Sequence, residues 1–115
     1  MIPLKILIFG YDKAIVDIVE LGLQSENFIT HITIWQNISE QIKEFKPDLL
    51  ILDFQFIESC QQIAKDSTIY NVPFILISHP KDIEFYSHIC DAAAYVIKPL
   101  DVLDFVNTVK DVLSI

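Results

Sequence analysis

Three side chains in the sequence have the chemical types that phosphoryl transfer needs. Asp53, Ser78 and Lys98 each close an apolar run of strand length. A carboxylate can act as the nucleophile, an ammonium can neutralise the oxygens of a phosphoryl group, and a hydroxyl can donate a hydrogen bond to one of them. These side chains meet only if the three runs are strands of one parallel sheet, because the carboxyl ends of such strands share one edge, where ligands bind.

The chain has the alternation of elements that such a sheet requires. Short apolar runs alternate with stretches of helical period, which is typical of repeated βα units. Strands are predicted at residues 4–9, 29–35, 49–53, 72–78 and 93–98. Four of them are almost continuously apolar, as strands covered on both faces are, whereas 29–35 alternates apolar residues with Thr or His. That second strand is predicted to lie at an edge of the sheet.

Five helices are predicted between and after these strands, at residues 13–25, 38–45, 58–65, 82–90 and 100–113. Asp12 is well placed to cap the first of them. The second must end before Pro47, because the residue before a proline is disfavoured in helical conformation. With 115 residues, no linker and no internal repeat, residues 1–115 form a single α/β domain.

Composition excludes several classes of partner. Sixteen acidic residues against eight Lys and Arg give a formal charge of −8, which repels nucleic acid and anionic lipid surfaces. We therefore expect no nucleic-acid binding and no membrane binding. Cys60 and Cys90 have no spacing that suggests a disulfide framework or a zinc site, and the N-terminus lacks the features of a signal peptide, so a reducing cytoplasm is expected.

Three motifs together carry a resemblance to a known family. The segments PDLLILD (47–53), VPFILIS (72–78) and AAYVIKP (93–99) occur in the order and on the strands of the response-regulator receiver domains of two-component signalling. The sequence resembles this family over its whole length. The resemblance implies a doubly wound, five-stranded parallel sheet of flavodoxin-like topology with strand order 2-1-3-4-5.

The resemblance also implies roles for single residues. Asp53 matches the phosphoacceptor position, Ser78 the hydroxyl that engages the phosphoryl group, and Lys98 the bridging cation. Tyr95 matches the aromatic switch residue, and Pro99 would follow Lys98 through a cis peptide bond. An alternative role for Tyr95 is that of an ordinary aromatic residue of the core or rim.

A function in two-component or phosphorelay signal transduction follows from the resemblance. The implied partners are a histidine kinase or phosphotransfer protein and a downstream protein target, with output through protein contact. No enzymatic activity is expected beyond self-phosphorylation of Asp53 from a phosphodonor.

The sequence departs from the family where the metal ion should bind. The family has two adjacent acidic residues after the first strand, whereas Gly10 and Tyr11 occupy those positions here. Mg²⁺ prefers several oxygen ligands, so we expect weak binding at most, through Asp53 and, as an alternative to its role as a helix cap, Asp12.

Two alternative functions remain open. Asp53 could be an ordinary buried carboxylate paired with Lys98, in which case the chain is a phosphorylation-independent docking module. A flavodoxin-like cofactor-binding protein would share the architecture, but the sequence from Gly10 to Lys13 is a poor phosphate-binding loop because Asp12 repels the ligand.

The final helix has a wide apolar surface, which suggests an interface. Its expected inward stripe is Val102, Val106, Val109 and Leu113, and three further apolar residues widen the arc: Leu103, Phe105 and Val112. A stripe of roughly 100° suffices to cover a sheet. We therefore predict a homodimer or partner contact through the fourth helix, fifth strand and fifth helix. The alternative is that Phe105 and Val112 pack within the domain.

Overall fold

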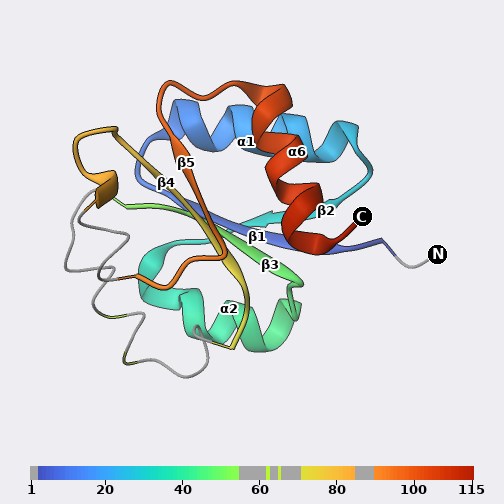
Figure 1. The fold of residues 1–115 in the computed structure, drawn as a ribbon. Coiled ribbons are helices and arrows are strands. Elements are labelled where there is room, and N and C mark those ends of the chain that lie inside the picture. Colours follow the sequence, from blue (N-terminus) through green and yellow to red (C-terminus); the bar gives the residue numbers. More distant parts are fainter. Residues whose placement is uncertain (1–2, 55–61, 63–64, 66–70, 85–89) are drawn as a thin grey trace.

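The computed structural model of the protein describes residues 3–54, 62, 65, 71–84 and 90–115. Its centre is one parallel sheet with the strand order β2-β1-β3-β4-β5 (Figure 1). The strands are β1 (Lys5–Gly10), β2 (Ile29–Ile32), β3 (Leu49–Asp53), β4 (Phe74–Ser78) and β5 (Ala94–Ile97). The predicted fold class and strand order are confirmed, and β2 lies at an edge as predicted.

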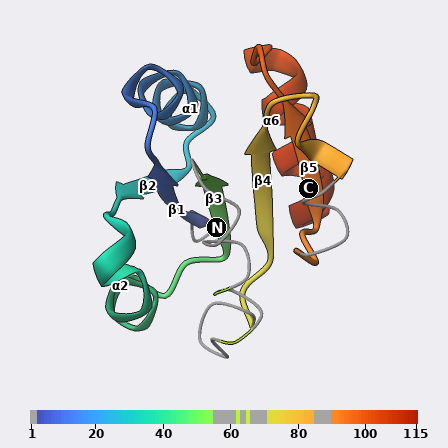
Figure 2. The same ribbon diagram turned by 90° about the vertical axis from the view of Figure 1, so that its left-hand side faces the viewer.

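Helices cover both faces of this sheet. On one face lie α1 (Lys13–Ser25) and α6 (Val102–Leu113), and on the other lies α2 (Ile38–Phe45), which a short 3-10 helix at Trp35–Asn37 precedes (Figure 2). The predicted helix at 58–65 lies almost entirely outside the described residues, as do residues 85–89 of the helix predicted at 82–90. The second strand is shorter than predicted because the chain turns into the 3-10 helix at Trp35.

Short-range interactions explain where the two long helices begin. The side chain of Asp12 accepts a hydrogen bond from the Ala14 N–H at 3.0 Å, which confirms its predicted role as the cap of α1. Asp101 caps α6 in the same way through the Asp104 N–H at 3.0 Å. Each cap satisfies a backbone donor that has no partner within its helix.

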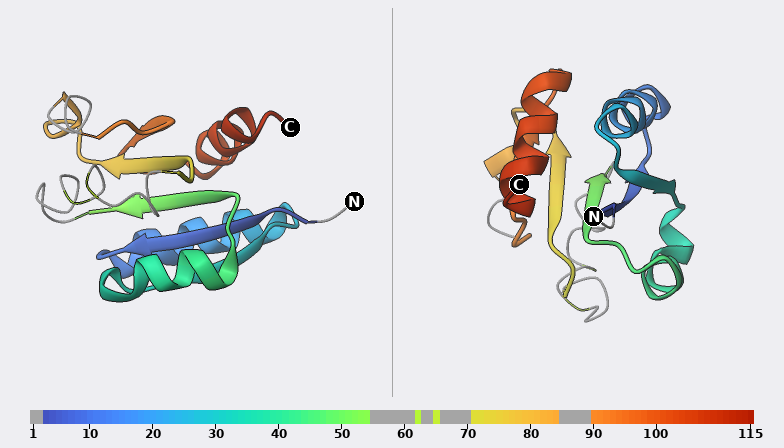
Figure 3. Two further views of the ribbon diagram at one scale, coloured as in Figure 1. Left: turned by 90° about the horizontal axis from the view of Figure 1, so that it is seen from below. Right: turned by 90° about the vertical axis from the view of Figure 1, so that its right-hand side faces the viewer.

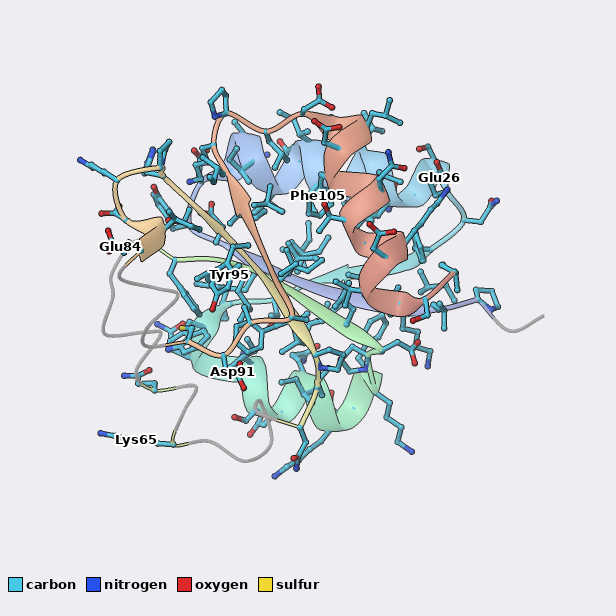
Figure 4. The ribbon with its side chains drawn as sticks, in the orientation of Figure 1. Glu26, Lys65, Glu84, Asp91, Tyr95 and Phe105 are labelled. Atoms are coloured by element: carbon cyan, nitrogen blue, oxygen red, sulfur yellow. The ribbon has the colours of Figure 1, made fainter. Side chains whose placement is uncertain are left out.

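The core on the α1 and α6 face contains Phe105, and this overturns part of the sequence prediction. Phe105 is 0% exposed, and in Figure 4 it lies between α6 and the sheet. Val112 also packs against this core, whereas Val102, predicted to point inward, is 41% exposed. The helix is rotated relative to the predicted stripe, so Phe105 fills the interior of the domain. The alternative that Phe105 and Val112 pack within the domain is therefore confirmed, and of the three residues that suggested an interface through α6 only Leu103 remains exposed, at 68%.

A glycine allows α1 and α6 to approach closely. A Cβ on Gly22 would lie 2.9 Å from Cγ1 of Val102, which is closer than carbon atoms normally approach. A larger residue at position 22 would therefore require Val102 or α6 to move.

The core on the α2 face is rich in aromatic side chains. Trp35 packs against Phe9 and Phe54, with ring centroids 5.4 Å and 4.9 Å apart. Phe9 precedes Gly10 and Phe54 follows Asp53, so Trp35 is close to the carboxyl ends of β1 and β3. Its fluorescence is therefore suited to report changes at that edge.

Cys90 is buried in the same core and is disulfide-bonded, which the cysteine spacing gave no reason to expect. Cys60, the other cysteine of the chain, lies outside the described residues.

The carboxyl ends of the strands gather at one edge of the molecule. In Figure 3 the arrowheads of β1, β3 and β4 point the same way, and both chain termini lie at the opposite end. Among the described residues, no helix is long and apolar enough to cross a membrane. Asp53 ends β3, Ser78 ends β4 and Lys98 directly follows β5, so the three side chains with predicted chemistry lie at this carboxyl edge.

Candidate functional site

Asp53 and Lys98 form an ion pair at the carboxyl edge of the sheet. Lys98 Nζ lies 2.9 Å from Oδ1 of Asp53, and their side chains are 8% and 2% exposed. Asp53 ends β3, the middle strand, and Lys98 directly follows β5 at one edge of the sheet, so the lysine stem must reach across the end of β4. The structure thus brings together two of the three residues predicted to act in phosphoryl transfer.

Burial sets the electrostatics of this pair. Removal from water raises the pKa of the Asp53 carboxyl above its usual value, although the Lys98 ammonium opposes the change. Burial also acts to lower the pKa of Lys98, but the neighbouring Asp53 carboxylate outweighs this and raises it. The lysine therefore stays charged, and the carboxylate is more basic than an exposed one.

Asp53 has unused capacity to bind a ligand. Apart from the ion pair, neither of its carboxylate oxygens accepts a well-formed hydrogen bond within the described part of the chain, although the Asp12 backbone N–H lies close enough to help lower the pKa of the carboxyl. Buried carboxylate oxygens normally have partners, since an unsatisfied one is costly. The Oδ2 atom is close to β1, because it would lie 3.5 Å from a Cβ placed on Gly10.

Tyr11 is a third member of the site. Its backbone N–H donates a hydrogen bond to the Asp53 carbonyl at 3.2 Å. Its side chain contacts Lys98, the charged partner of Asp53: Lys98 Nζ is 4.8 Å from the ring centroid and 3.5 Å from the hydroxyl oxygen. Tyr11 itself is 43% exposed. The residue found where the family has a metal ligand thus contacts the lysine of the site.

Ser78 lies on the strand between Asp53 and Lys98, as predicted. Its backbone carbonyl accepts a hydrogen bond from the Lys98 N–H at 2.9 Å, and its hydroxyl donates to the His79 carbonyl at 3.0 Å. The hydroxyl is therefore engaged with its own neighbour and would have to rotate to reach a group bound at Asp53.

Two further predicted residues are Tyr95, which lies on β5, and Pro99, which directly follows Lys98. The Tyr95 hydroxyl donates to the Cys90 carbonyl and accepts from the Ala92 N–H at 3.3 Å, which ties the side chain to the segment before β5. The Lys98–Pro99 peptide bond is cis, as the resemblance implied.

The side chains present do not fit the usual magnesium site. Gly10 offers no side-chain ligand and Tyr11 contacts Lys98, while Oδ1 of Asp12 already caps α1. In the described part of the chain, no group of three or more His, Cys, Asp or Glu side chains could hold a metal ion. Although Asp53 has an unpartnered oxygen, one carboxylate paired with an ammonium is a poor ligand set for Mg²⁺, which needs several oxygen ligands.

A shallow cavity lies next to Tyr11, and Asp53 is not among its lining residues. Its volume is about 240 Å³, and its lining residues come from the end of β1, the start of α1 and the end of β2: Gly10, Tyr11, Lys13, Val16, Asp17 and Ile32. The loop between β1 and α1 uses its backbone donors internally, since the N–H groups of Tyr11, Ala14 and Val16 bond to Asp53 and Asp12. This loop is therefore not a phosphate cradle of the flavodoxin kind.

Sequence reasoning missed the contact between Tyr11 and Lys98. It identified Tyr11 only as a substitution in the metal-binding pair, and the two residues are 87 positions apart. The signal that could have found it is the coincidence of a large aromatic side chain and a lysine at one sheet edge. Periodicity shows which strands they follow but not how far their side chains reach.

Comparisons with solved structures agree with this architecture, whereas no protein-family model matches the sequence. A candidate response regulator from Chloroflexus aurantiacus is 21% identical over 99% of this chain and 100% of that chain, with a TM-score of 0.83. A diguanylate cyclase modulated by a response-regulator receiver, from Pelobacter carbinolicus, is 25% identical over 96% of this chain and 92% of that chain, with a TM-score of 0.77. A response regulator from Thermotoga maritima is 16% identical over 99% and 100% of the two chains, with a TM-score of 0.79. By its topology and its structural neighbours, the chain is a domain of the CheY-like response-regulator receiver fold.

Proposed function

We propose that this chain is a receiver in two-component or phosphorelay signalling, that Asp53 is its phosphoacceptor and that its output is a protein contact. The observation that carries the proposal is the 2.9 Å ion pair between Lys98 and Asp53 at the carboxyl edge of a receiver-fold sheet. Burying two charges is costly. A pair kept at the edge where α/β proteins bind ligands, with an unpartnered carboxylate oxygen, is suited to chemistry there.

The reaction would use these residues as follows. An oxygen of Asp53 attacks the phosphorus of a donor, a new P–O bond forms, and the bond from phosphorus to the donor's leaving atom breaks with its electron pair. Lys98 neutralises charge on the transferred phosphoryl oxygens, and the Ser78 hydroxyl donates to one of them after turning from the His79 carbonyl. Because Gly10 and Tyr11 supply no metal ligand, charge neutralisation in this reaction rests on Lys98.

A second candidate function is docking without phosphorylation. It is favoured by the replacement of the acidic pair by Gly10 and Tyr11, which leaves an anionic donor to approach buried Asp53 without a cation beyond Lys98. In this case the ion pair is a fixed structural element, and the fold presents one permanent contact surface.

Mass spectrometry after incubation with acetyl phosphate, with and without Mg²⁺, separates the two functions. A receiver that accepts phosphate gains one phosphoryl group, which an Asp53→Asn variant does not. Asp111→Asn is a matched control, because Asp111 is an exposed carboxylate on α6. Absence of labelling under every condition, in protein shown to be folded, favours docking.

Partners and location follow from the same proposal. A histidine kinase or phosphotransfer protein would supply the phosphoryl group, and a downstream protein would bind the result. The net charge of −8 opposes binding to nucleic acid or anionic membranes. Such a signalling pathway places the chain in the cytoplasm, whereas the Cys90 disulfide argues against that location because persistent disulfides are rare there. The redox state of Cys90 in freshly isolated protein tests that location.

A further inference from the structure

We propose that Tyr11 is a positioning residue, whose side chain holds the Lys98 ammonium in place over Asp53. The proposal deepens the receiver function, because it rests on Asp53 and Lys98 being the working pair of the site. It assigns a role to the aromatic residue at the position where the family has a metal ligand.

The side chains of Tyr11 and Lys98 follow two strands that are not neighbours in the sheet. In the sheet, β1 and β5 are separated by β3 and β4, and neighbouring strands lie about 4.8 Å apart, so the ends of β1 and β5 are about 14 Å apart. Tyr11 follows β1 and Lys98 follows β5. Their contact therefore closes over the end of the sheet, in which Asp53 is the last residue of β3.

The Lys98 ammonium contacts both Asp53 and Tyr11. Lys98 Nζ has Asp53 Oδ1 at 2.9 Å, whereas the Tyr11 hydroxyl oxygen is at 3.5 Å, the limit of a hydrogen bond. The ring centroid is 4.8 Å away, so Nζ is nearer to the hydroxyl oxygen and lies at the hydroxyl end of the ring rather than over its centre. The hydroxyl and the ring therefore both contact the ammonium.

Tyr11 is more exposed than the ion pair that it contacts. Tyr11 is 43% exposed, but the charged groups beside it are 8% and 2% exposed. A side chain so exposed contributes little to the core. Its ring lies against an ammonium that would otherwise meet more water, and cation–ring attraction strengthens as water is removed.

The proposal predicts how accessible Lys98 is to a small amine-acetylating reagent. Peptide mass mapping gives the acetylation rate of Lys98 relative to Lys13, whose side chain is 88% exposed and serves as an internal reference. Tyr11→Phe keeps the ring but removes the hydroxyl, so it should raise this ratio less than Tyr11→Leu does. Tyr11→Leu keeps apolar bulk without a ring and should raise it about tenfold, as should Tyr11→Ala.

Two controls make the result specific. Ile32 lines the same shallow cavity as Tyr11. Ile32→Ala removes apolar surface from that cavity and should leave Lys98 acetylation unchanged. Circular dichroism of every variant shows whether the fold is retained, and Tyr11→Leu decides the matter if Tyr11→Ala unfolds.

Loss of Lys98 protection in Tyr11→Leu supports the proposal, and the Tyr11→Phe result divides the effect between the ring and the hydroxyl. If Tyr11→Leu protects Lys98 as well as the native residue does, the Tyr11 side chain does not hold the ammonium and the proposal is wrong. Acetylation of Lys98 needs no phosphorylation, so a chain whose Asp53 never accepts phosphate refutes the phosphoacceptor role without affecting this test.

Discussion

A Cβ atom placed on Gly10 would lie 2.5 Å from Cγ2 of Val16, a distance that carbon atoms do not tolerate. Val16 is a buried residue of α1, and the branched side chain of a valine in a helix has one strongly preferred rotamer. A side chain at position 10 therefore requires Val16 to change its rotamer or the first turn of α1 to shift.

This contact predicts the outcome of a gain-of-function experiment. Gly10→Asp with Tyr11→Asp should lower the free energy of unfolding by about 1–3 kcal/mol through crowding against Val16. Adding Val16→Ala should relieve the crowding, allow Mg²⁺ binding and raise acetyl phosphate labelling of Asp53. Urea unfolding and mass spectrometry measure the two effects. Equal stability of the native chain and the double variant would show that Val16 yields easily.

Magnesium should have little effect on the native protein. Because Gly10 and Tyr11 supply no carboxylate, millimolar Mg²⁺ should leave Trp35 fluorescence nearly unchanged, although this ring packs on Phe9 and Phe54 next to the site. The triple variant is the positive control. Saturable binding to the native chain below about 1 mM would mean that carboxylate ligands have been overlooked.

The ion pair should show strong coupling in a double-mutant cycle. Lys98→Met leaves Asp53 buried without a counter-charge, so it should destabilise the fold by about 3 kcal/mol. Asp53→Asn in the same chain should restore much of this loss, because the remaining pair is uncharged. Urea unfolding of the four proteins at pH 7 measures the coupling. Additive effects of the two changes would mean that the pair is not coupled in solution.

The pH dependence of stability should reflect the raised pKa of Asp53. A carboxyl whose folded-state pKa lies above its ordinary 3.8 binds a proton more tightly when folded. Its contribution to stability is therefore largest at low pH and is lost as the pH rises through the folded pKa. Measured against Asp53→Asn, which does not titrate there, the native chain should lose relative stability from pH 4 upward. A relative gain over that range would contradict the raised pKa.

Phe105 should behave as a core residue. Phe105→Ala should reduce the free energy of unfolding by about 3–5 kcal/mol, because the side chain is 0% exposed. Leu103→Ala, on the exposed side of the same helix at 68% exposure, should change it by less than about 0.5 kcal/mol. If Phe105→Ala instead leaves stability unchanged and converts a dimer to a monomer in sedimentation, the original interface prediction was right.

The sequence by itself determined the sheet and the identity of its central charged pair. Continuous apolar runs mark strands buried on both faces, and the polar residue ending each run must lie at the carboxyl edge, so Asp53, Ser78 and Lys98 could be placed without coordinates. The cap of α1 at Asp12 was equally local, since it depends on residues two positions apart.

Tertiary structure alone decided three further points. Periodicity defines an apolar arc but not the rotation of a helix, so the sequence left open whether Phe105 lies in an interface or in the interior, where the structure places it. The crowding of Gly10 by Val16 and the contact of Tyr11 with Lys98 depend on side chains from different elements meeting at short range. Spacing along the chain carries no information about such distances, because packing of the complete domain sets them.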